Sequence, residues 1–426
     1  MSSISEKKPY EDILNHAMST VPYYISSNIG YNGKQSVQQL WLKLPILLKS
    51  KVQSSPKDFI SNKYLSEYHS GRLSNKKTSG STGVCMGIYW SINDYSRANR
   101  EAWKYRKKWY GINIEDRYIC FHTTLYSGNN FVDEEMPVLK KSVYISFSKN
   151  LINEKIHDYF MHISSFKPVW MLAQPSVLYI MLNLATAEEL DILKELSYIE
   201  LTGEFLQPGM LQYIKSKLPF TKICNMYGTT ETGCISLQCP YGHNHIINNA
   251  YVEIYKGDER ICSSDDDSNN RYGEDGDIVL TSLKNTVMPL LKYKIGDYGN
   301  INKVSCDCGF NGNDIELKIG RTSEVISLPN GMQKSSFVLW YAVEAINSEY
   351  NNPIIRAYFK QKKDFSIVAY INLKKEFNNW EKSIFESLTE YLYKSVSADL
   401  SYTVISASNG NLNESNKQPF FETERI

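Results

Sequence analysis

Residues 78–83 read TSGSTG, a run of six small residues of which four carry hydroxyl groups. Glycine-rich loops between a strand and a helix bind phosphate through backbone N–H groups and hydroxyls. The run lacks the Gly-Lys-Ser/Thr ending of P-loop enzymes and the glycine spacing of a dinucleotide fingerprint. Taken alone, it is as compatible with a surface turn as with a phosphate-binding loop. The residues of this loop are Thr78, Ser79, Gly80, Ser81, Thr82 and Gly83.

Cysteine and histidine residues gather in two short segments, CPYGHNH (239–245) and CDCGF (306–310). Thiolate and imidazole groups in sets of four are typical ligands of structural zinc. The segments are distant in sequence, so the fold must bring them together. The preferred ligand set is Cys239, His243, Cys306 and Cys308, with His245 as the first substitute. The alternative interpretation is that these cysteines are free thiols in loops.

Elements that would position such residues are clearest between residues 186 and 233. A capping box opens one helical pattern, and a proline lies in the first turn of a second. A short apolar run follows each helix. This alternation favours a parallel sheet with helices on its faces, and therefore an α/β fold. We expect helices at 186–197 and 208–218 and strands at 198–203 and 222–228.

Both expected strands end in polar residues, TGE (202–204) and YGTTE (227–231). Ligands of α/β proteins gather at the carboxyl ends of parallel strands. The two polar stretches are therefore candidates for a common binding site.

A basic stretch, SRANREAWKYRKKWYG (96–111), follows the small-residue loop and is expected to form a helix. Its positive charges could attract phosphate groups or CoA. The preferred interpretation is a solvated helix face with the tryptophans turned inward.

Composition indicates a globular protein with at least two domains, because 426 residues exceed what one core usually supports. Lys and Arg (47) nearly balance Asp and Glu (46), so we expect neither nucleic acid nor an anionic membrane as a partner. No apolar run approaches the roughly 20 residues that span a bilayer. We expect a cytoplasmic protein and leave a homodimer open.

The chain changes character after Arg321. A strand-like run, FSIVAYINLKK (365–375), precedes a helix-like run, EKSIFESLTEYLYKSV (381–396). We therefore expect a large domain at residues 1–320 and a small α+β domain at 321–426.

Five motifs follow one another in the order of a known superfamily. The sequence resembles the adenylate-forming superfamily of acyl-CoA synthetases, peptide-synthetase adenylation domains and luciferases, and most of all its phenylacetate–CoA ligase and capsule-biosynthesis branch. The resemblance implies a large domain with mixed and parallel sheets flanked by helices, and a small mobile C-terminal domain. After the TSGSTG loop, the motifs are LTGEFL (201–206), NMYGTTETG (225–233), YKIGDYG (293–299), IGRTSEVI (319–326) and a late Lys417.

The resemblance implies that ATP and a carboxylic acid form an acyl-AMP with release of pyrophosphate. The acyl group then passes to a thiol, either CoA or the pantetheine of a carrier protein. A second hypothesis is transfer to an amine, and a third is a non-catalytic nucleotide-binding protein. The segment SLPNGMQKSSF (327–337) departs from the family pattern near the thiol-entry tunnel, which leaves the acceptor open.

Roles for individual residues also come from the resemblance. The loop 78–83 would hold the leaving pyrophosphate, and Lys417 would neutralise charge at the α-phosphate. Glu231 would hold Mg²⁺, and Thr229 and Thr230 would approach the α-phosphate. Further nucleotide contacts are expected from Gly203, Glu204, Asn225, Tyr227, Gly228, Thr229, Asp297 and Arg321.

The acid pocket is expected between residues 122–128 and 173–179, with Tyr126 and Gln174 as contacts to an aromatic or other small acid. His245 matches a histidine that the branch keeps near its acyl site, which is the alternative to a metal ligand. Members of the branch carry a comparable Cys/His and Cys-x-Cys pattern, so the resemblance supports zinc as well.

Overall fold

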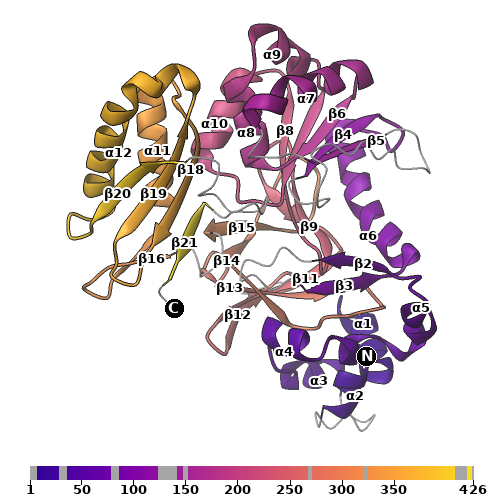
Figure 1. The fold of residues 1–426 in the computed structure, drawn as a ribbon. Coiled ribbons are helices and arrows are strands. Elements are labelled where there is room, and N and C mark those ends of the chain that lie inside the picture. The colour runs from indigo at the N-terminus through magenta and orange to yellow at the C-terminus, as the bar shows by residue number, and fades with distance from the viewer. Residues whose placement is uncertain are drawn as a thin grey trace. The chain divides into compact units, whose positions relative to one another are not determined.

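The computed structural model (Figure 1) describes eight stretches of the chain. The chain forms two compact units. One unit comprises Met1–Ile114 with Cys224–Lys318, and the other comprises Glu115–Ile223 with Ile319–Ile426. The chain changes unit at residue 319, close to the predicted boundary at 321. The predicted domains stay a prediction, because compactness alone does not say which parts move together. The described stretches are residues 7–27, 36–77, 86–122, 142–146, 152–266, 271–319, 325–407 and 420–424.

Short helices at the start of the first unit pack on its β-structure through aromatic side chains. Tyr10 stacks on Trp41 with ring centroids 3.9 Å apart, and both contact Tyr251. Trp41 also donates a hydrogen bond from Nε1 to the buried Glu253. The helices are α1 (Glu11–Thr20), α2 (Pro22–Ser26), α3 (Val37–Lys43), α4 (Lys49–Ser54) and α5 (Leu65–His69), with 3-10 turns at Pro56–Phe59 and Asn62–Tyr64.

The β-structure of the first unit consists mainly of antiparallel pairs. The strands run in the order β12-β11-β13-β14-β15-β10-β9-β8, and β1 (Leu47–Leu48) pairs in parallel with β14. Alternating apolar side chains form a buried core on this sheet. The strands are β8 (Lys222–Thr229), β9 (Gly233–Gln238), β10 (Asn244–Ile246), β11 (Ala250–Lys256), β12 (Glu259–Ser263), β13 (Gly276–Ser282), β14 (Tyr293–Lys303) and β15 (Asn313–Ile319).

The expected basic helix is present in the first unit. Helix α6 (Ile92–Tyr105) continues into a π-helical turn at Arg106–Tyr110, and Gly111 ends it with φ of +76°. A hairpin of β2 (Ser74–Lys77) and β3 (Gly87–Trp90) precedes this helix.

The second unit contains the predicted α/β arrangement. Four parallel strands lie in the order β7-β6-β4-β5, and apolar residues of the helices cover one face of this sheet. The predicted capping box is formed between Thr186 and Glu189. The strands are β4 (Tyr118–His122), β5 (Ser142–Ser146), β6 (Trp170–Ala173) and β7 (Tyr198–Thr202), and the helices are α7 (Ile152–Phe166), α8 (Pro175–Leu184), α9 (Ala187–Lys194) and α10 (Pro208–Lys217).

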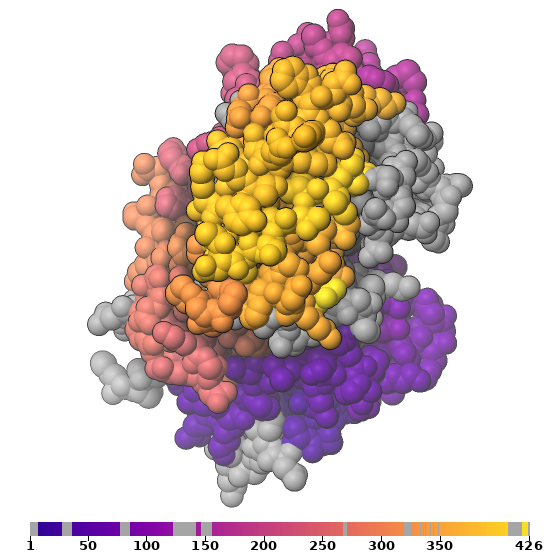
Figure 2. All heavy atoms as spheres, turned by 60° about the vertical axis from the view of Figure 1, so that its left-hand side comes forward, coloured from indigo at the N-terminus to yellow at the C-terminus, as the bar shows by residue number. Residues whose placement is uncertain are grey.

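The C-terminal part of the second unit is the predicted α+β structure, and Figure 2 shows its residues in orange to yellow as one continuous surface. Its main sheet has the order β20-β19-β18-β21 and shares a core with two helices. Asn347 donates a hydrogen bond to the Tyr179 hydroxyl of α8 (3.0 Å). The elements are β16 (Val325–Ser327), β17 (Gln333–Ser335), α11 (Phe337–Glu349), β18 (Ile354–Gln361), β19 (Ile367–Leu373), a 3-10 turn at Lys375–Trp380, α12 (Glu381–Ser395), β20 (Tyr402–Ser406) and β21 (Phe421–Thr423).

The predicted fold class is confirmed, since the chain is a mixed α/β protein with helices packed on sheets. Within the stretches that the structure describes, no helix is long and apolar enough to cross a membrane.

Candidate functional site

The YGTTE residues form the end of β8 and the start of its turn into β9. Thr229 Oγ1 accepts a hydrogen bond from the backbone N–H of Thr232 (3.3 Å) and lies 2.9 Å from its hydroxyl. Trp90 Nε1 donates to the carbonyl of Thr230 (3.0 Å). The turn is therefore held by contacts with its own residues and with strand β3.

Gly228 is required by the close approach of the two hairpin strands. A Cβ atom at this position would lie 2.9 Å from the carbonyl oxygen of Gly233. Such a contact forces backbone to move, so any side chain here would separate the strands. The glycine of the predicted motif therefore has a structural reason that is independent of any ligand.

Two predicted nucleotide-binding residues meet beside this hairpin. The Tyr227 hydroxyl of β8 donates a 2.8 Å hydrogen bond to Oδ2 of Asp297 on β14. Glu231 lies in the hairpin turn and is 8% exposed. Asn225 is fixed on β8 by a bond from its backbone N–H to Gln238 Oε1 (3.3 Å). The first unit thus brings together the residues expected to contact adenosine and Mg²⁺.

The second unit brings together three other predicted residues at the carboxyl ends of β6 and β7. Gly203 has a φ of +83°, and a Cβ atom there would lie 3.7 Å from the Gln174 side chain. Glu204 Oε2 accepts a hydrogen bond from the backbone N–H of Ser176 at the start of α8 (3.1 Å). This is the edge of a parallel sheet where ligands are expected.

Other predicted residues lie outside the described stretches. They are the loop residues 78–83, Tyr126, Arg321 and Lys417. Their roles stay predictions.

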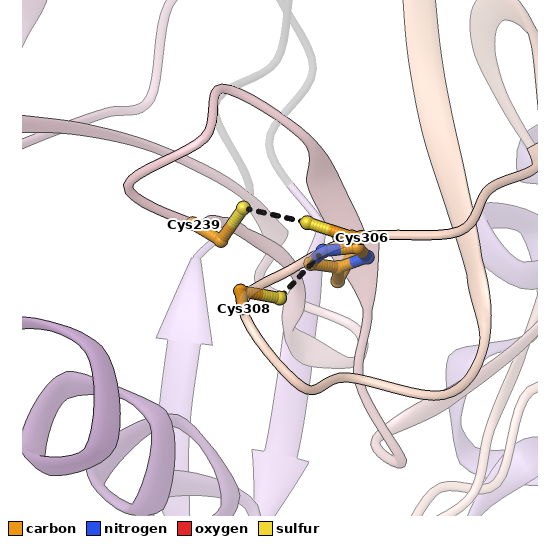
Figure 3. Close-up of side chains that lie close together, drawn as sticks. Cys239, Cys306 and Cys308 are labelled. Carbon is orange, nitrogen blue, oxygen red and sulfur yellow. Dashed lines mark hydrogen bonds between the residues drawn. The ribbon is translucent and has the colours of Figure 1, made fainter.

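A cluster of three cysteines and one histidine lies in the first unit (Figure 3). Cys239 Sγ is 3.7 Å from Cys306 Sγ, and Cys308 Sγ is 3.2 Å from His245 Nε2. The four candidate ligand atoms all lie within 4.8 Å of one another. Cys239 follows β9, His245 is the middle residue of β10, and the other two cysteines come from the loop between β14 and β15.

These distances fit a tetrahedral zinc ion. Zinc–sulfur bonds of about 2.3 Å place two ligand sulfurs about 3.8 Å apart. A disulfide requires about 2.05 Å, so the Cys239–Cys306 pair is not a disulfide, and its distance is compatible with two ligands of one ion. The seven described cysteines are all free.

The histidine in the cluster is His245, the predicted substitute, and not the preferred His243. His243 Nδ1 lies 3.1 Å from Asp314 Oδ2, and 37% of its side chain is exposed. The His245 ring is fully buried and stacks on Phe310 at 4.6 Å. Because His245 faces Cys308 in this buried place, the geometry does not favour the alternative that it contacts the carboxylic acid.

The electrostatic environment matches that of a metal ligand set. Burial lowers the pKa of His245 to about 4, with smaller contributions from His243 and Lys108, so the imidazole is neutral at neutral pH. Burial also raises the pKa of Cys239 and raises that of Cys308 to about 12. A bound cation would favour the thiolate form of these cysteines and so act against this rise in pKa.

Side chains that the sequence analysis did not assign to the cluster enclose it. Trp109, from the π-helical turn, lies 5.6 Å from the His245 ring and 6.0 Å from Phe310. Lys108 donates a hydrogen bond to the carbonyl of Gly309 (2.9 Å). The sequence contained a sign of these neighbours. Phe310 is the last residue of the CDCGF segment, and Lys108 and Trp109 belong to KKWY (107–110).

The chain matches known proteins in part of its sequence and in its fold. The model of the family described as AMP-binding enzyme matches residues 78–279. No curated protein matches the chain.

Solved structures of ligases share the fold at low sequence identity. A 2-hydroxyisobutyryl-CoA ligase in the postadenylation state, in complex with 2-HIB-AMP, has a TM-score of 0.68 at 12% identity, over 98% of this chain and 88% of that chain. The same ligase with 2-HIB-AMP and CoA, in the thioesterification state, has a TM-score of 0.59 at 13% identity, over 97% and 88%. The anthranilate CoA ligase AuaEII with anthranoyl-AMP has a TM-score of 0.54 at 15% identity, over 81% and 65%.

These findings confirm the resemblance to the adenylate-forming superfamily. The chain has the fold of adenylate-forming ligases, and residues 78–279 match the AMP-binding enzyme family.

Proposed function

We propose that the protein is an ATP-dependent, carboxylate-activating ligase that forms an acyl-AMP and transfers the acyl group to a thiol. The observation that carries the proposal is the AMP-binding enzyme match over residues 78–279, which includes the YGTTE hairpin beside Asp297. The related structures with bound acyl-adenylates support the same reaction.

In the first half-reaction, a carboxylate oxygen of the acid attacks the α-phosphorus of ATP. An acyl–oxygen–phosphorus linkage forms, and the bond to the β-phosphate breaks to release pyrophosphate. Positioning and charge neutralisation dominate such chemistry. The loop 78–83 holds the leaving pyrophosphate, Asp297 binds the ribose hydroxyls and Tyr227 lies against adenine.

The hairpin geometry sharpens the roles of the two threonines. The Thr229 hydroxyl is engaged by Thr232, so we assign the side-chain contact with the α-phosphate to Thr230. Trp90 fixes the carbonyl of that residue and so its orientation. Glu231 holds Mg²⁺, a hard cation that prefers carboxylate and phosphate oxygens and neutralises the phosphate charge.

Lys417 is assigned to a small C-terminal domain, residues 321–426, that carries it to the α-phosphate for adenylation. Gln174, together with Gly203 and Glu204, lies at a sheet edge suited to the acid and to the adenine pocket. The acid is an aromatic or other small acid of the kind used by the phenylacetate–CoA ligase branch. The 2-hydroxyisobutyryl and anthranoyl adenylates of the related structures support a small acid.

The second half-reaction transfers the acyl group to the thiol of CoA or of a carrier-protein pantetheine, with AMP as the leaving group. The related ligase with bound CoA supports a thiol. Transfer to an amine is the second candidate, because SLPNGMQKSSF (327–337) departs from the family segment at the thiol-entry tunnel.

The proposal is tested by incubating the protein with ATP, Mg²⁺ and single acids, including 2-hydroxyisobutyrate, anthranilate and phenylacetate. Acid-dependent release of pyrophosphate is expected. Addition of CoA or of amines, followed by mass measurement of the product, then distinguishes a thioester from an amide. A protein that binds ATP and releases no pyrophosphate with any acid would be the non-catalytic nucleotide-binding protein instead.

We also propose that Cys239, His245, Cys306 and Cys308 bind a structural zinc ion. The mutual distances of the four ligand atoms support this assignment, as does the buried His245, whose neutral imidazole can bind a cation. Elemental analysis of the purified protein is expected to find one zinc per chain. Zinc-free protein that folds normally would contradict the proposal.

A further inference from the structure

A cavity lies in the first unit, and none of the predicted nucleotide-binding residues lines it. Its volume is about 460 Å³, within the range of roughly 300–1,000 Å³ that is common for small-molecule pockets. The walls come from the C-terminal end of α6 and the π-helical turn, from residues 246–251 and from the loop 309–313 that follows Cys308. The proposed adenylation reaction leaves this cavity without a role.

The charged side chains among the described residues of the cavity wall are all positive. Lys104 and Lys108 line it, and no acidic residue occurs among the described residues of its wall. These two lysines are four residues apart and therefore project from neighbouring positions on one helix face. Both residues are exposed. Asn248 and Asn311 add amide groups to the same wall.

The opposite wall is fixed in place by side-chain contacts. Lys108 Nζ donates to the carbonyl of Gly309, and Asn313 Nδ2 donates to the carbonyl of Ser264 (3.3 Å). Between these two anchors, Phe310 packs edge-on against Tyr105 with centroids 5.4 Å apart. A pre-formed wall lowers the entropic cost of binding a ligand. The cavity thus combines a positive rim with an aromatic surface.

We propose that this cavity binds the phosphate group of a small phosphorylated metabolite. Lysine binds phosphate as a point charge, and two ammonium groups suit a dianion better than a single carboxylate. The aromatic surface of Tyr105 and Phe310 would contact the body of the metabolite. The proposal replaces the interpretation of this helix face as merely solvated, and it does not depend on the adenylation reaction.

The test is calorimetric titration of the full-length protein with inorganic phosphate at constant ionic strength, with acetate as a second probe. Lys104→Gln and Lys108→Gln are each expected to weaken phosphate binding roughly tenfold, the effect of losing one charge-assisted hydrogen bond. Lys107→Gln is the matched control. Lys107 is a neighbouring exposed lysine that does not line the cavity, so this variant should bind phosphate as the wild type does.

Lys104→Gln is the decisive variant, because Lys104 is exposed and Lys108 also anchors the loop at Gly309. An unchanged melting temperature shows that the variant folds. The proposal is overturned if the wild type does not bind phosphate, if the Lys104→Gln, Lys108→Gln double variant binds it unchanged, or if Lys107→Gln weakens binding equally. If phosphate bound to the loop 78–83 and not to the cavity, the double variant would bind it unchanged. Acetate binding as tight as phosphate binding would also overturn it.

Discussion

Two regions of the first unit place polar side chains close together, and they differ in what satisfies those side chains. In the YGTTE hairpin, the hydroxyls and carbonyls find partners on the protein, as in the Thr229–Thr232 and Trp90–Thr230 contacts. In the cysteine cluster, the four candidate ligand atoms lie close to one another, with Cys239 and His245 buried and the other two cysteines partly buried. The hairpin is therefore organised by contacts within the protein, whereas the cluster has the ligand types and spacing of the proposed metal site.

This difference predicts two kinds of variant. Changes near the nucleotide should alter catalysis and leave stability almost unchanged, since the nucleotide binds and leaves. Changes in the cluster should alter metal content and stability, since structural metal binding contributes directly to folding.

The largest effect is expected for Lys417→Ala. Loss of a group that stabilises transition-state charge lowers the adenylation rate by roughly 10²- to 10³-fold. Acid-dependent pyrophosphate release measures this rate, and the melting temperature should not change. A variant that keeps the full adenylation rate would remove Lys417 from the mechanism.

A large loss of metal is expected for Cys308→Ala. Changes to outer-shell partners of a metal already cost roughly 10- to 100-fold in affinity, and loss of a direct ligand should exceed that. Zinc content and melting temperature should both fall. Cys262→Ala is the control, because Cys262 is a free cysteine that lies outside the cluster. Equal zinc content in both variants would contradict the assignment.

The histidine ligand is tested by a matched pair of substitutions. His245→Gln should lose zinc, because this side chain lies 3.2 Å from Cys308 Sγ. His243→Gln should retain zinc, because His243 pairs with Asp314 and is partly exposed. Elemental analysis of the two purified variants checks the prediction, and the reverse outcome would restore His243 as the ligand.

A smaller effect is expected for Asp297→Asn, which replaces the carboxylate proposed to bind the ribose. The KM for ATP should rise roughly tenfold, as for loss of a hydrogen bond to a charged group. Tyr227→Phe removes only the 2.8 Å bond to this carboxylate and keeps the ring, so its KM should rise less. A larger effect from Tyr227→Phe than from Asp297→Asn would indicate that the Asp297 carboxylate does not bind the ribose.

Local patterns in the sequence predicted helices of the second unit. The capping box at Thr186 and the proline of α10 define helix starts, and both depend on neighbouring residues alone. The meeting of Cys239 with Cys306 was predicted from ligand chemistry and the resemblance, because spacing alone cannot bring distant segments together.

The sequence alone could not decide whether His243 or His245 belongs to the cluster. His243 and His245 are two residues apart, so their side chains leave an extended segment on the same face. The pairing of Asp314 with one ring and the stacking of Phe310 on the other separate their roles, and both contacts are tertiary. The cavity wall that Lys104 and Phe310 line likewise depends on tertiary contacts, which the sequence alone does not reveal.

Transfer of an oxygen label tests the central claim most directly. The protein is incubated with ATP, Mg²⁺ and a substrate acid whose carboxylate carries ¹⁸O, followed by the acceptor. Attack of the carboxylate on the α-phosphorus predicts that AMP carries one ¹⁸O atom and that pyrophosphate carries none. Label in inorganic phosphate, with ADP as the other product, would show attack at the γ-phosphate and would contradict adenylate formation.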